Sequence, residues 1–313
     1  MAGLFNKFYY GNAGKADFTP DQLPKNRFQL FLAMLRVRFS GIVGQNFLFL
    51  LFALPALAWT VINVLAILNV IGYGAEEAVE TAAISWDAVR GYISIYILGM
   101  IPCLMVASLG KMGEALTLRN WARDDHSFVM SDFKDTLKTN WKQALLIGFI
   151  NGFSIFAAYV AYIYYNSMAA SSVIWVVPEA LVFMFVGLWW LCLMVMYPMV
   201  VTYEMSFKTI IRNSLIMTIA KLPFALLCGV VPVLIPFLIV WLIPSNIALL
   251  VVVLYFLILG FGITHFIHAS FANMCFDAYL NTRIEGAEVN KGLRDPSYNE
   301  EDEKVTEEDV KNL

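Results

Sequence analysis

The stretch Leu222–Ile243, LPFALLCGVVPVLIPFLIVWLI, decides the fold class. It carries no charged side chain and reaches the roughly 20 helical residues that cross about 30 Å of bilayer hydrocarbon. Five further predominantly apolar runs reach that length: Gly41–Ile71, Tyr92–Leu118, Ala144–Tyr165, Val173–Tyr203 and Ile247–Ala272. The sequence therefore predicts an all-α membrane protein with six transmembrane helices.

The composition of the whole chain agrees with this class. Hydrophobic residues make up 60% of the chain, and the mean hydropathy is +0.69, both far from the values of a soluble globular protein. The net charge is only −3, and the basic residues flank the spans, where membrane topology accounts for them. Membrane lipid is therefore an expected partner, and nucleic acid is not.

Lysine and arginine residues gather on one predicted side of the membrane. They lie in the N-terminal arm, the second and fourth connections and the C-terminal tail, whereas the first connection carries only Arg90 and the third and fifth carry none. Because cytoplasmic segments carry the excess of basic residues, both termini are predicted to be cytoplasmic. No cleavable signal peptide is visible, so the first span is expected to act as an uncleaved anchor in the plasma membrane.

Three regions are predicted along the chain. Residues 1–26 form a cytoplasmic N-terminal arm, residues 27–278 the six-helix transmembrane domain, and residues 279–313 a cytoplasmic tail. The tail contains the acidic runs Glu300–Glu303 and Glu307–Asp309 and few apolar side chains. Such a segment buries too little apolar surface to order itself, so we expect it to be disordered.

Amphipathic segments are predicted on the cytoplasmic surface before three of the spans. In Arg27–Phe39 apolar side chains recur at steps of three and four, which places them on one helical face. Similar segments, Asp132–Asn140 and Ser206–Ser214, precede the third and fifth spans. One interpretation is three repeated units of surface helix plus helical hairpin; the alternative is that any linker before a span has this pattern. The units would be Arg27–Leu118, Phe128–Glu204 and Met205–Ala278.

Two prolines, Pro232 and Pro236, interrupt the fifth run. Proline removes a backbone donor, so it kinks a membrane helix unless neighbouring groups satisfy the freed carbonyl. Ordinary kinking is one interpretation. A broken helix that lines a cavity is the other.

Ionisable side chains within the spans are expensive and each needs a partner or water. Lys111 and Glu114 stand three residues apart near the cytoplasmic end of the second span, so they share a face and are predicted to pair. A structural pair is favoured over a transport site because a matched pair near a span end can reach the headgroups. Glu179 lies near the outer end of the fourth span. It reaches the outer interface or, if it turns inward, contacts a proton or substrate.

The histidines His265 and His268 share a face near the cytoplasmic end of the last span. Two histidines are too few for a metal site, and His126 is placed in a loop, so neither a metal nor another cofactor is expected. No sequence signature of a hydrolase or metalloprotease stands in a credible setting. No loop is large enough to form a catalytic domain. The sequence therefore predicts a protein that is not an enzyme.

The second connection, Arg119–Gln143, is the longest on the predicted cytoplasmic side. It combines aromatic and basic side chains, the types that dominate protein–protein interfaces. One hypothesis is that it docks a partner; the alternative is that its aromatic residues form the belt at the inner membrane surface. The candidates for partner contact are Arg119, Trp121, Arg123, His126, Phe128, Phe133 and Trp141.

Two blocks of sequence resemble a known family. They are Asn46–Pro55, NFLFLLFALP, and Arg119–Phe128, RNWARDDHSF, the second followed by SDFK at residues 131–134 and NWKQ at residues 140–143. Together they resemble the YesL-like family of bacterial integral membrane proteins over roughly Phe28 to Asp277. The resemblance implies a bacterial plasma-membrane protein with an accessory or regulatory role in carbohydrate uptake. It also implies subunits of an ABC-type carbohydrate transporter as partners, and it supplies no catalytic residues.

The alternative function is a transporter or permease that moves a small solute itself. An ABC sugar permease of the usual kind carries a Glu-Ala-Ala loop followed by glycine before its last spans. Here Glu114-Ala115-Leu116 stands before the third span and no such loop follows. The accessory role is therefore preferred, and co-purification in mild detergent would distinguish the two.

Overall fold

The computed structural model describes residues 23–72 and 86–294, which contain helices and no strands. Six helical segments there are long and apolar enough to cross a membrane. They are α3 (Phe39–Val70), α4 (Trp86–Trp121), α5 (Val129–Ala169), α6 (Val176–Thr202), α8 (Leu222–Leu242) and the sixth span, which joins α9 (Asn246–Tyr255) to α10 (Phe261–Tyr279). The all-α membrane fold with six spans is confirmed. The expectations for residues 1–22 of the N-terminal arm and for residues 295–313 of the tail concern residues outside the described part of the chain. Residues 279–294 of the predicted tail are described and include a 3-10 helix at Asn281–Arg283.

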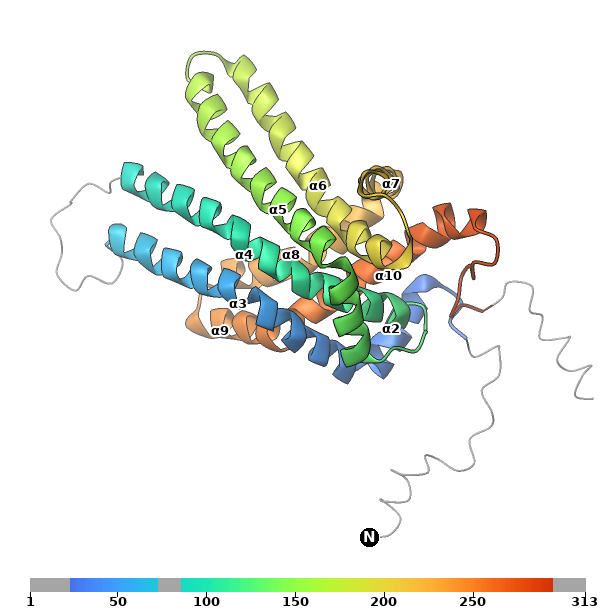
Figure 1. Cartoon of the computed structure of the whole chain (residues 1–313). Helices are drawn as coiled ribbons and strands as arrows, with labels where there is room; N and C mark the ends of the chain where they lie inside the picture. The colour runs from blue at the N-terminus through green and yellow to red at the C-terminus, as the bar shows by residue number, and fades with distance from the viewer. Residues whose placement is uncertain (1–22, 73–85, 295–313) are drawn as a thin grey trace, which may run out of the picture.

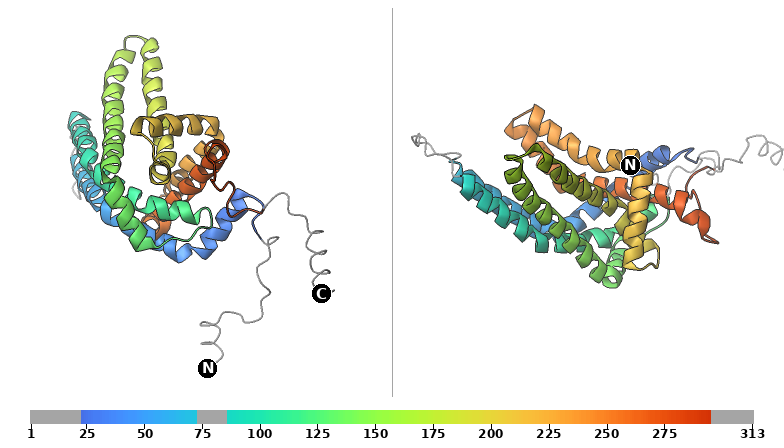
Figure 2. Two further views of the ribbon diagram at one scale, coloured as in Figure 1. Left: turned by 45° about the vertical axis from the view of Figure 1, so that its right-hand side comes forward. Right: turned by 90° about the horizontal axis from the view of Figure 1, so that it is seen from above.

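The spans form three hairpins: α3 with α4, α5 with α6, and α8 with the sixth span (Figure 1). The second member of each hairpin packs against the other two, because α10 contacts both α4 and α6, and α4 contacts α6. The α3–α4 and α5–α6 hairpins diverge toward their tips (Figures 1 and 2). In α6 every residue from Leu191 to Val200 is buried, whereas most of its first half is exposed. The closely packed core therefore lies at the end of the bundle opposite the hairpin tips.

Close packing of α4 against α5 depends on two glycines spaced four apart, Gly148 and Gly152. A Cβ atom on Gly148 would lie 2.7 Å from the Cα of Met105, and one on Gly152 would lie 2.9 Å from the Cα of Ile101. Small residues at this spacing let two membrane helices approach with their backbones in contact.

Two of the three predicted surface helices are separate elements, α2 (Arg27–Val37) and α7 (Phe207–Ala220). The side chains of Asn26 and Ser206 cap their first turns by accepting hydrogen bonds from backbone amides. The third, Asp132–Asn140, is instead the start of α5 and runs without a break into the span. No glycine or proline occurs between Val129 and Ile147 to end the helix. The connection between α4 and α5 is thus only residues 122–128, shorter than predicted.

The fifth span, α8, continues through both Pro232 and Pro236. The interpretation of a broken helix at these prolines is therefore wrong. The irregular span is the sixth, in which a π-helical segment, η3 (Phe256–Gly260), separates α9 from α10.

Asn46 on α3 holds this π-helical segment in place. Its side-chain amide donates hydrogen bonds to the carbonyl oxygens of Phe256 and Leu257 at 3.2 and 2.9 Å. Its side-chain oxygen accepts a hydrogen bond from the amide of Gly262 at 2.9 Å. Asn46 is fully buried, so water does not reach this site. Its three hydrogen bonds satisfy backbone groups that the widened π-helical turn leaves without a partner in the helix.

Candidate functional site

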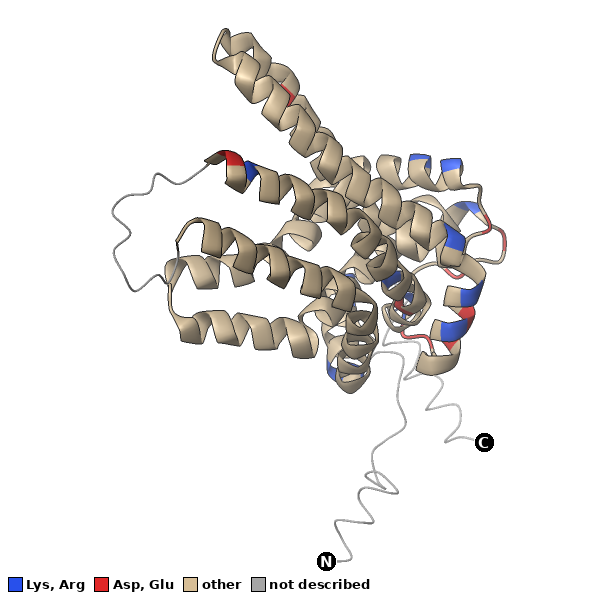
Figure 3. Ribbon diagram, turned by 60° about the vertical axis from the view of Figure 1, so that its left-hand side comes forward, with Lys and Arg blue, Asp and Glu red and all other residues tan. Residues whose placement is uncertain are grey.

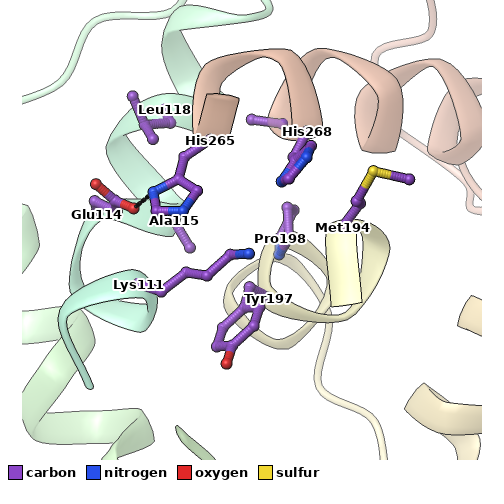
Figure 4. A pocket seen from close by; sticks show the side chains of 10 residues that line it. Lys111, Glu114, Ala115, Leu118, Met194, Tyr197, Pro198, His265 and His268 are labelled. Carbon is purple, nitrogen blue, oxygen red and sulfur yellow. Dashed lines mark ion pairs between the residues drawn. The ribbon is translucent and has the colours of Figure 1, made fainter. Parts of the chain in front are cut away.

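A small cavity lies where α4, α6 and α10 meet, within the closely packed end of the bundle (Figure 4). Its volume is about 20 Å³, room for about one water molecule. Five of the side chains that line it are polar or ionisable, and we call these the polar cluster. They are Lys111 and Glu114 from α4, Tyr197 from α6, and His265 and His268 from α10.

Glu114 pairs with His265, through one carboxylate oxygen and Nδ1 of the ring (Figure 4). Glu114 is fully buried, and His265 is nearly so. The ring of Phe49 stands edge-on to His265, with centroids 4.7 Å apart. This pair joins α4 to α10 inside the bundle.

The prediction that Lys111 is the direct partner of Glu114 is wrong, because Glu114 pairs with His265. The two side chains line the same cavity, as their spacing indicates, but they extend toward different helices (Figure 4). The Lys111 ammonium lies 5.0 Å from the centroid of the Tyr197 ring. This is a cation–π contact, which partly compensates a desolvated ammonium group. Lys111 thus links α4 to α6, whereas Glu114 links α4 to α10.

Tyr197 extends the polar cluster toward α5. Its hydroxyl oxygen lies 2.7 Å from Oγ of Ser108, and Ser108 donates a hydrogen bond to the carbonyl oxygen of Ala144 at 2.6 Å. Because Ser108 has one hydroxyl hydrogen, Tyr197 is the donor in the bond between them. All three residues are buried.

His268 lies close to His265, with ring centroids 6.1 Å apart. Neither of its ring nitrogens makes a hydrogen bond of normal geometry to the described residues. A water molecule in the cavity would satisfy them, as is usual for buried polar groups without a protein partner. Within residues 23–72 and 86–294, no group of three or more His, Cys, Asp and Glu side chains could hold a metal ion.

The polar cluster has the chemistry to hold and pass a proton. It places a carboxylate, two imidazoles, an ammonium group and a phenol side by side within membrane spans. Chains of carboxylate and histidine side chains are the usual proton relays of membrane proteins. Glu179 is not part of it, since it lies half-buried in the first turn of α6, at the opposite end of that span from Tyr197.

The proposed docking candidates divide into buried and exposed residues. Trp121, Phe133 and Arg123 are only 3%, 5% and 6% exposed, so the prediction that they contact a partner is wrong. Trp121 fills the space over Gly41, Phe133 packs on Gly113, and Arg123 donates a hydrogen bond to the carbonyl oxygen of Glu288 at 2.8 Å.

Three of the remaining docking candidates are exposed and one is half-buried. His126 and Phe128 are exposed and stack edge to face, with ring centroids 4.8 Å apart, and Trp141 is also exposed. Arg119 is half-buried. The docking candidates that remain available to a partner are therefore the His126–Phe128 pair and Trp141, which lies about three turns into α5. We call these three residues the exposed aromatic group.

Sequence reasoning missed the roles of Tyr197, Ser108 and Asn46. A single tyrosine or serine in an apolar run carries no mark of its role, because the partner stands on another helix. The signal for Asn46 was its amide group in a long apolar run, which requires internal hydrogen-bond partners. The backbone groups that Asn46 binds belong to the π-helical segment and to Gly262. The sequence does not predict a π-helical segment, so it could not identify these partners.

A family model described as "Protein of unknown function, DUF624" matches residues 42–162. No curated protein and no solved structure matches the chain. The matched range runs from α3 into α5, so it contains Asn46, Lys111, Glu114 and the exposed aromatic group. Tyr197 and both histidines of the polar cluster lie beyond it. Residues 42–162 are thus similar to a family whose function is uncharacterised.

Proposed function

We propose that this chain is a multipass protein of the bacterial plasma membrane with both termini in the cytoplasm. The distribution of charge on the folded chain supports this orientation (Figure 3). Lysine and arginine side chains gather around the closely packed end, near α2, α7 and the start of α5. The opposite end of α4 carries Asp87 and Arg90, which pair with each other. An excess of basic residues on one side is the main determinant of orientation.

Its role, in this proposal, is that of a non-catalytic accessory or regulatory component of carbohydrate uptake, beside the subunits of an ABC-type transporter. The observation that supports the accessory role is the small size of the cavity where α4, α6 and α10 meet, whose volume is about 20 Å³. Pockets for small molecules typically measure about 300–1,000 Å³. The carbohydrate substrate rests on the resemblance of the two sequence blocks, and the exposed aromatic group supplies a surface for a partner.

The experiment is an affinity pull-down from native bacterial membranes in mild detergent, scored by mass spectrometry. The test variant combines Phe128→Ala and Trp141→Ala, because these side chains are 69% and 46% exposed. The control is Phe185→Ala, an equally exposed aromatic residue on α6. We expect wild type and control to retain transporter subunits and the test variant to lose them while keeping its size-exclusion profile. Retention of the same subunits by all three proteins would exclude docking through this group.

A second candidate function is a transporter of a small solute, and the polar cluster is the observation that favours it. Buried ionisable groups within spans commonly mark ion or substrate pathways. The test is proton movement in proteoliposomes loaded with a pH-sensitive dye, comparing wild type with Glu114→Gln. A proton flux that depends on Glu114 would favour transport, and equal dye signals in both samples would favour the accessory role.

A further inference from the structure

A larger pocket lies at the basic end of the bundle, separate from the polar cluster. Its volume is about 510 Å³, within the range of pockets for small molecules and cofactors. Three parts of the chain form its walls: the end of α4 with the loop that follows, the end of α6, and the segment 281–288 after α10. Arg119 and Arg123 come from the first wall, and we call this the arginine pocket.

Within the described residues, neither guanidinium group in this pocket forms a direct ion pair, although Asp125 and Asp277 interact electrostatically with Arg119 at longer range. Arg123 is 6% exposed and uses one Nη to donate to the Glu288 carbonyl. Arg119 uses one Nη to donate to the side chain of Asn120 at 2.9 Å. The Nε of each is buried without a hydrogen-bond partner in the described part of the chain. Across residues 23–72 and 86–294, neither arginine has a carboxylate oxygen within 4.0 Å.

The acidic residues nearby are occupied by other cations. Asp125 and Glu288 both line the pocket, and both pair with the ammonium group of Lys291, at 2.8 and 2.5 Å. These two hydrogen bonds raise the pKa of Lys291, so it remains charged. Asp277, at the end of α10, pairs with Arg27 of α2. The lining thus holds two arginines and two carboxylates, and both carboxylates pair directly with Lys291 rather than with the arginines.

Hydrogen bonds join the walls of the pocket to one another and to α10. The side chain of Asn273 on α10 donates to the carbonyl oxygen of Arg119 at 2.9 Å, which fixes the end of α4. The hydroxyl of Tyr203, just after α6, donates to the side chain of Asn281 at 2.6 Å. Burial raises the pKa of Tyr203 to about 12, so this hydroxyl keeps its hydrogen. A site of this kind is formed before its ligand arrives, which lowers the cost of binding.

We propose that the arginine pocket binds a phosphate group. A buried charge without a partner is costly, and an anion between Arg119 and Arg123 would remove that cost. A phosphomonoester carries a charge of about −1.5 to −2 and three terminal acceptor oxygens. The phosphodiester of a phospholipid carries a charge of about −1 and two terminal oxygens, and the planar guanidinium fork matches either group in a bidentate manner. The ligand is either a soluble phosphorylated small molecule or the headgroup of an anionic phospholipid. The inference does not depend on the proposed role in uptake.

The test measures binding to the purified full-length protein with two probes. The first is inorganic phosphate, titrated by calorimetry into delipidated protein in detergent. The second is phosphatidylglycerol, added to the same protein and scored as retained lipid by native mass spectrometry. Phosphatidylcholine, whose phosphate is balanced by a quaternary ammonium group, is the zwitterionic comparison. The first variant, Arg119→Gln, removes the positive charge. The second, Arg119→Lys, keeps the positive charge and a side chain that favours helix, but it lacks the planar guanidinium group that binds phosphate in a bidentate manner. Arg212→Gln on α7 is the control, since this arginine is exposed.

We expect wild type and Arg212→Gln to bind at least one probe. Arg119→Gln should bind it roughly tenfold more weakly or worse, as expected for a lost charge-assisted hydrogen bond. Arg119→Lys should be intermediate. Binding of inorganic phosphate identifies a soluble ligand, and binding of phosphatidylglycerol alone identifies a headgroup. The proposal is overturned if wild type binds neither probe, if both Arg119 variants bind like wild type, or if Arg212→Gln weakens binding as much as Arg119→Gln.

Discussion

Glu114 on α4 pairs with His265 on α10, although Lys111 stands three residues away on its own helix. The first hairpin is thereby joined to the third through a buried polar contact. Lys111 is left to contact the aromatic ring of Tyr197 on α6. The three second members of the hairpins are therefore held together by two polar contacts that both originate within one turn of α4.

Removal of either member of the Glu114–His265 pair should destabilise the protein. The single variants Glu114→Ala and His265→Ala should each lower the free energy of unfolding by about 1.5–3 kcal/mol, because a buried polar group loses its partner. The double variant should lose less than the sum, as measured by unfolding in mixed micelles. The pair Glu114→Ala and Asn69→Ala is the matched comparison and should be additive, because Asn69 is exposed at the far end of α3. Strict additivity for Glu114 and His265 would contradict the pairing.

Asn46→Ala should destabilise the sixth span. The change removes three hydrogen bonds to the π-helical segment and to Gly262, and interhelical bonds of this type are worth about 0.6–2 kcal/mol each. Unfolding in detergent, followed by circular dichroism, should show a loss of at least about 1 kcal/mol. Asn69→Ala is the control, since Asn69 is exposed at the end of α3. Equal stability of the two variants would exclude this role for Asn46.

Gly148→Ala should separate α4 from α5. The new Cβ would lie 2.7 Å from the Cα of Met105 and 2.8 Å from the carbonyl oxygen of Leu104, so backbone must move. Overpacking of this kind typically costs about 1–3 kcal/mol. The melting temperature in detergent should fall, while Gly187→Ala, where no atom lies within 4 Å of the added Cβ, should leave it unchanged or raised. A Gly148→Ala protein as stable as wild type would show that this contact is not tight.

Reporter fusions should place Lys15, Lys134 and Leu313 inside the cell, and Glu80 and Ser171 outside. This outcome follows from the asymmetry of basic residues along the chain. The measurement is the paired activity of a reporter that works only in the cytoplasm and one that works only outside it. An exterior signal at Lys134 or Leu313 would falsify the proposed orientation.

The contribution of Lys291 should disappear at alkaline pH. Hydrogen bonds to Asp125 and Glu288 raise its pKa above the ordinary 10.5. A raised lysine pKa contributes stability that is complete below the ordinary pKa and is lost as the pH rises through the raised value. The pair is partly exposed, so we expect Lys291→Gln to lose only about 0.2–1 kcal/mol at pH 8. The difference in melting temperature between wild type and variant should vanish as the pH rises through the raised pKa of Lys291; a constant difference would contradict this account.

Hydropathy and charge predicted the spans because length and polarity are properties of single segments. The same information placed Lys111, Glu114, His265 and His268 near one end of the membrane, where the structure brings them together. It could not identify their partners, because pairing across helices depends on how α4, α6 and α10 rotate about their axes. Helical spacing within α4 predicted Lys111 as the partner of Glu114. In the folded protein Glu114 pairs with His265 instead, because α10 packs against α4.

The sequence also failed to predict which aromatic residues are buried. Trp121 and Phe133 belong to types that are common both at interfaces and in cores, and composition cannot separate the two. The deciding features are Gly41 and Gly113, which leave space for their rings on neighbouring helices. Phe128, only a few residues away, has no such space and is exposed.

The π-helical segment Phe256–Gly260 has a consequence for insertions and deletions in the sixth span. A π-helical turn contains one more residue than an α-helical turn over the same segment. The extra residue is therefore confined to Phe256–Gly260, and it does not change the direction in which later side chains point. Deleting one residue within it should give a regular helix and keep His265 facing Glu114. Deleting one residue between Gly260 and His265 should rotate the histidine by about 100° around the helix axis. The π-helical segment thus maintains the rotation of α10 about its axis, so that His265 faces Glu114 on α4.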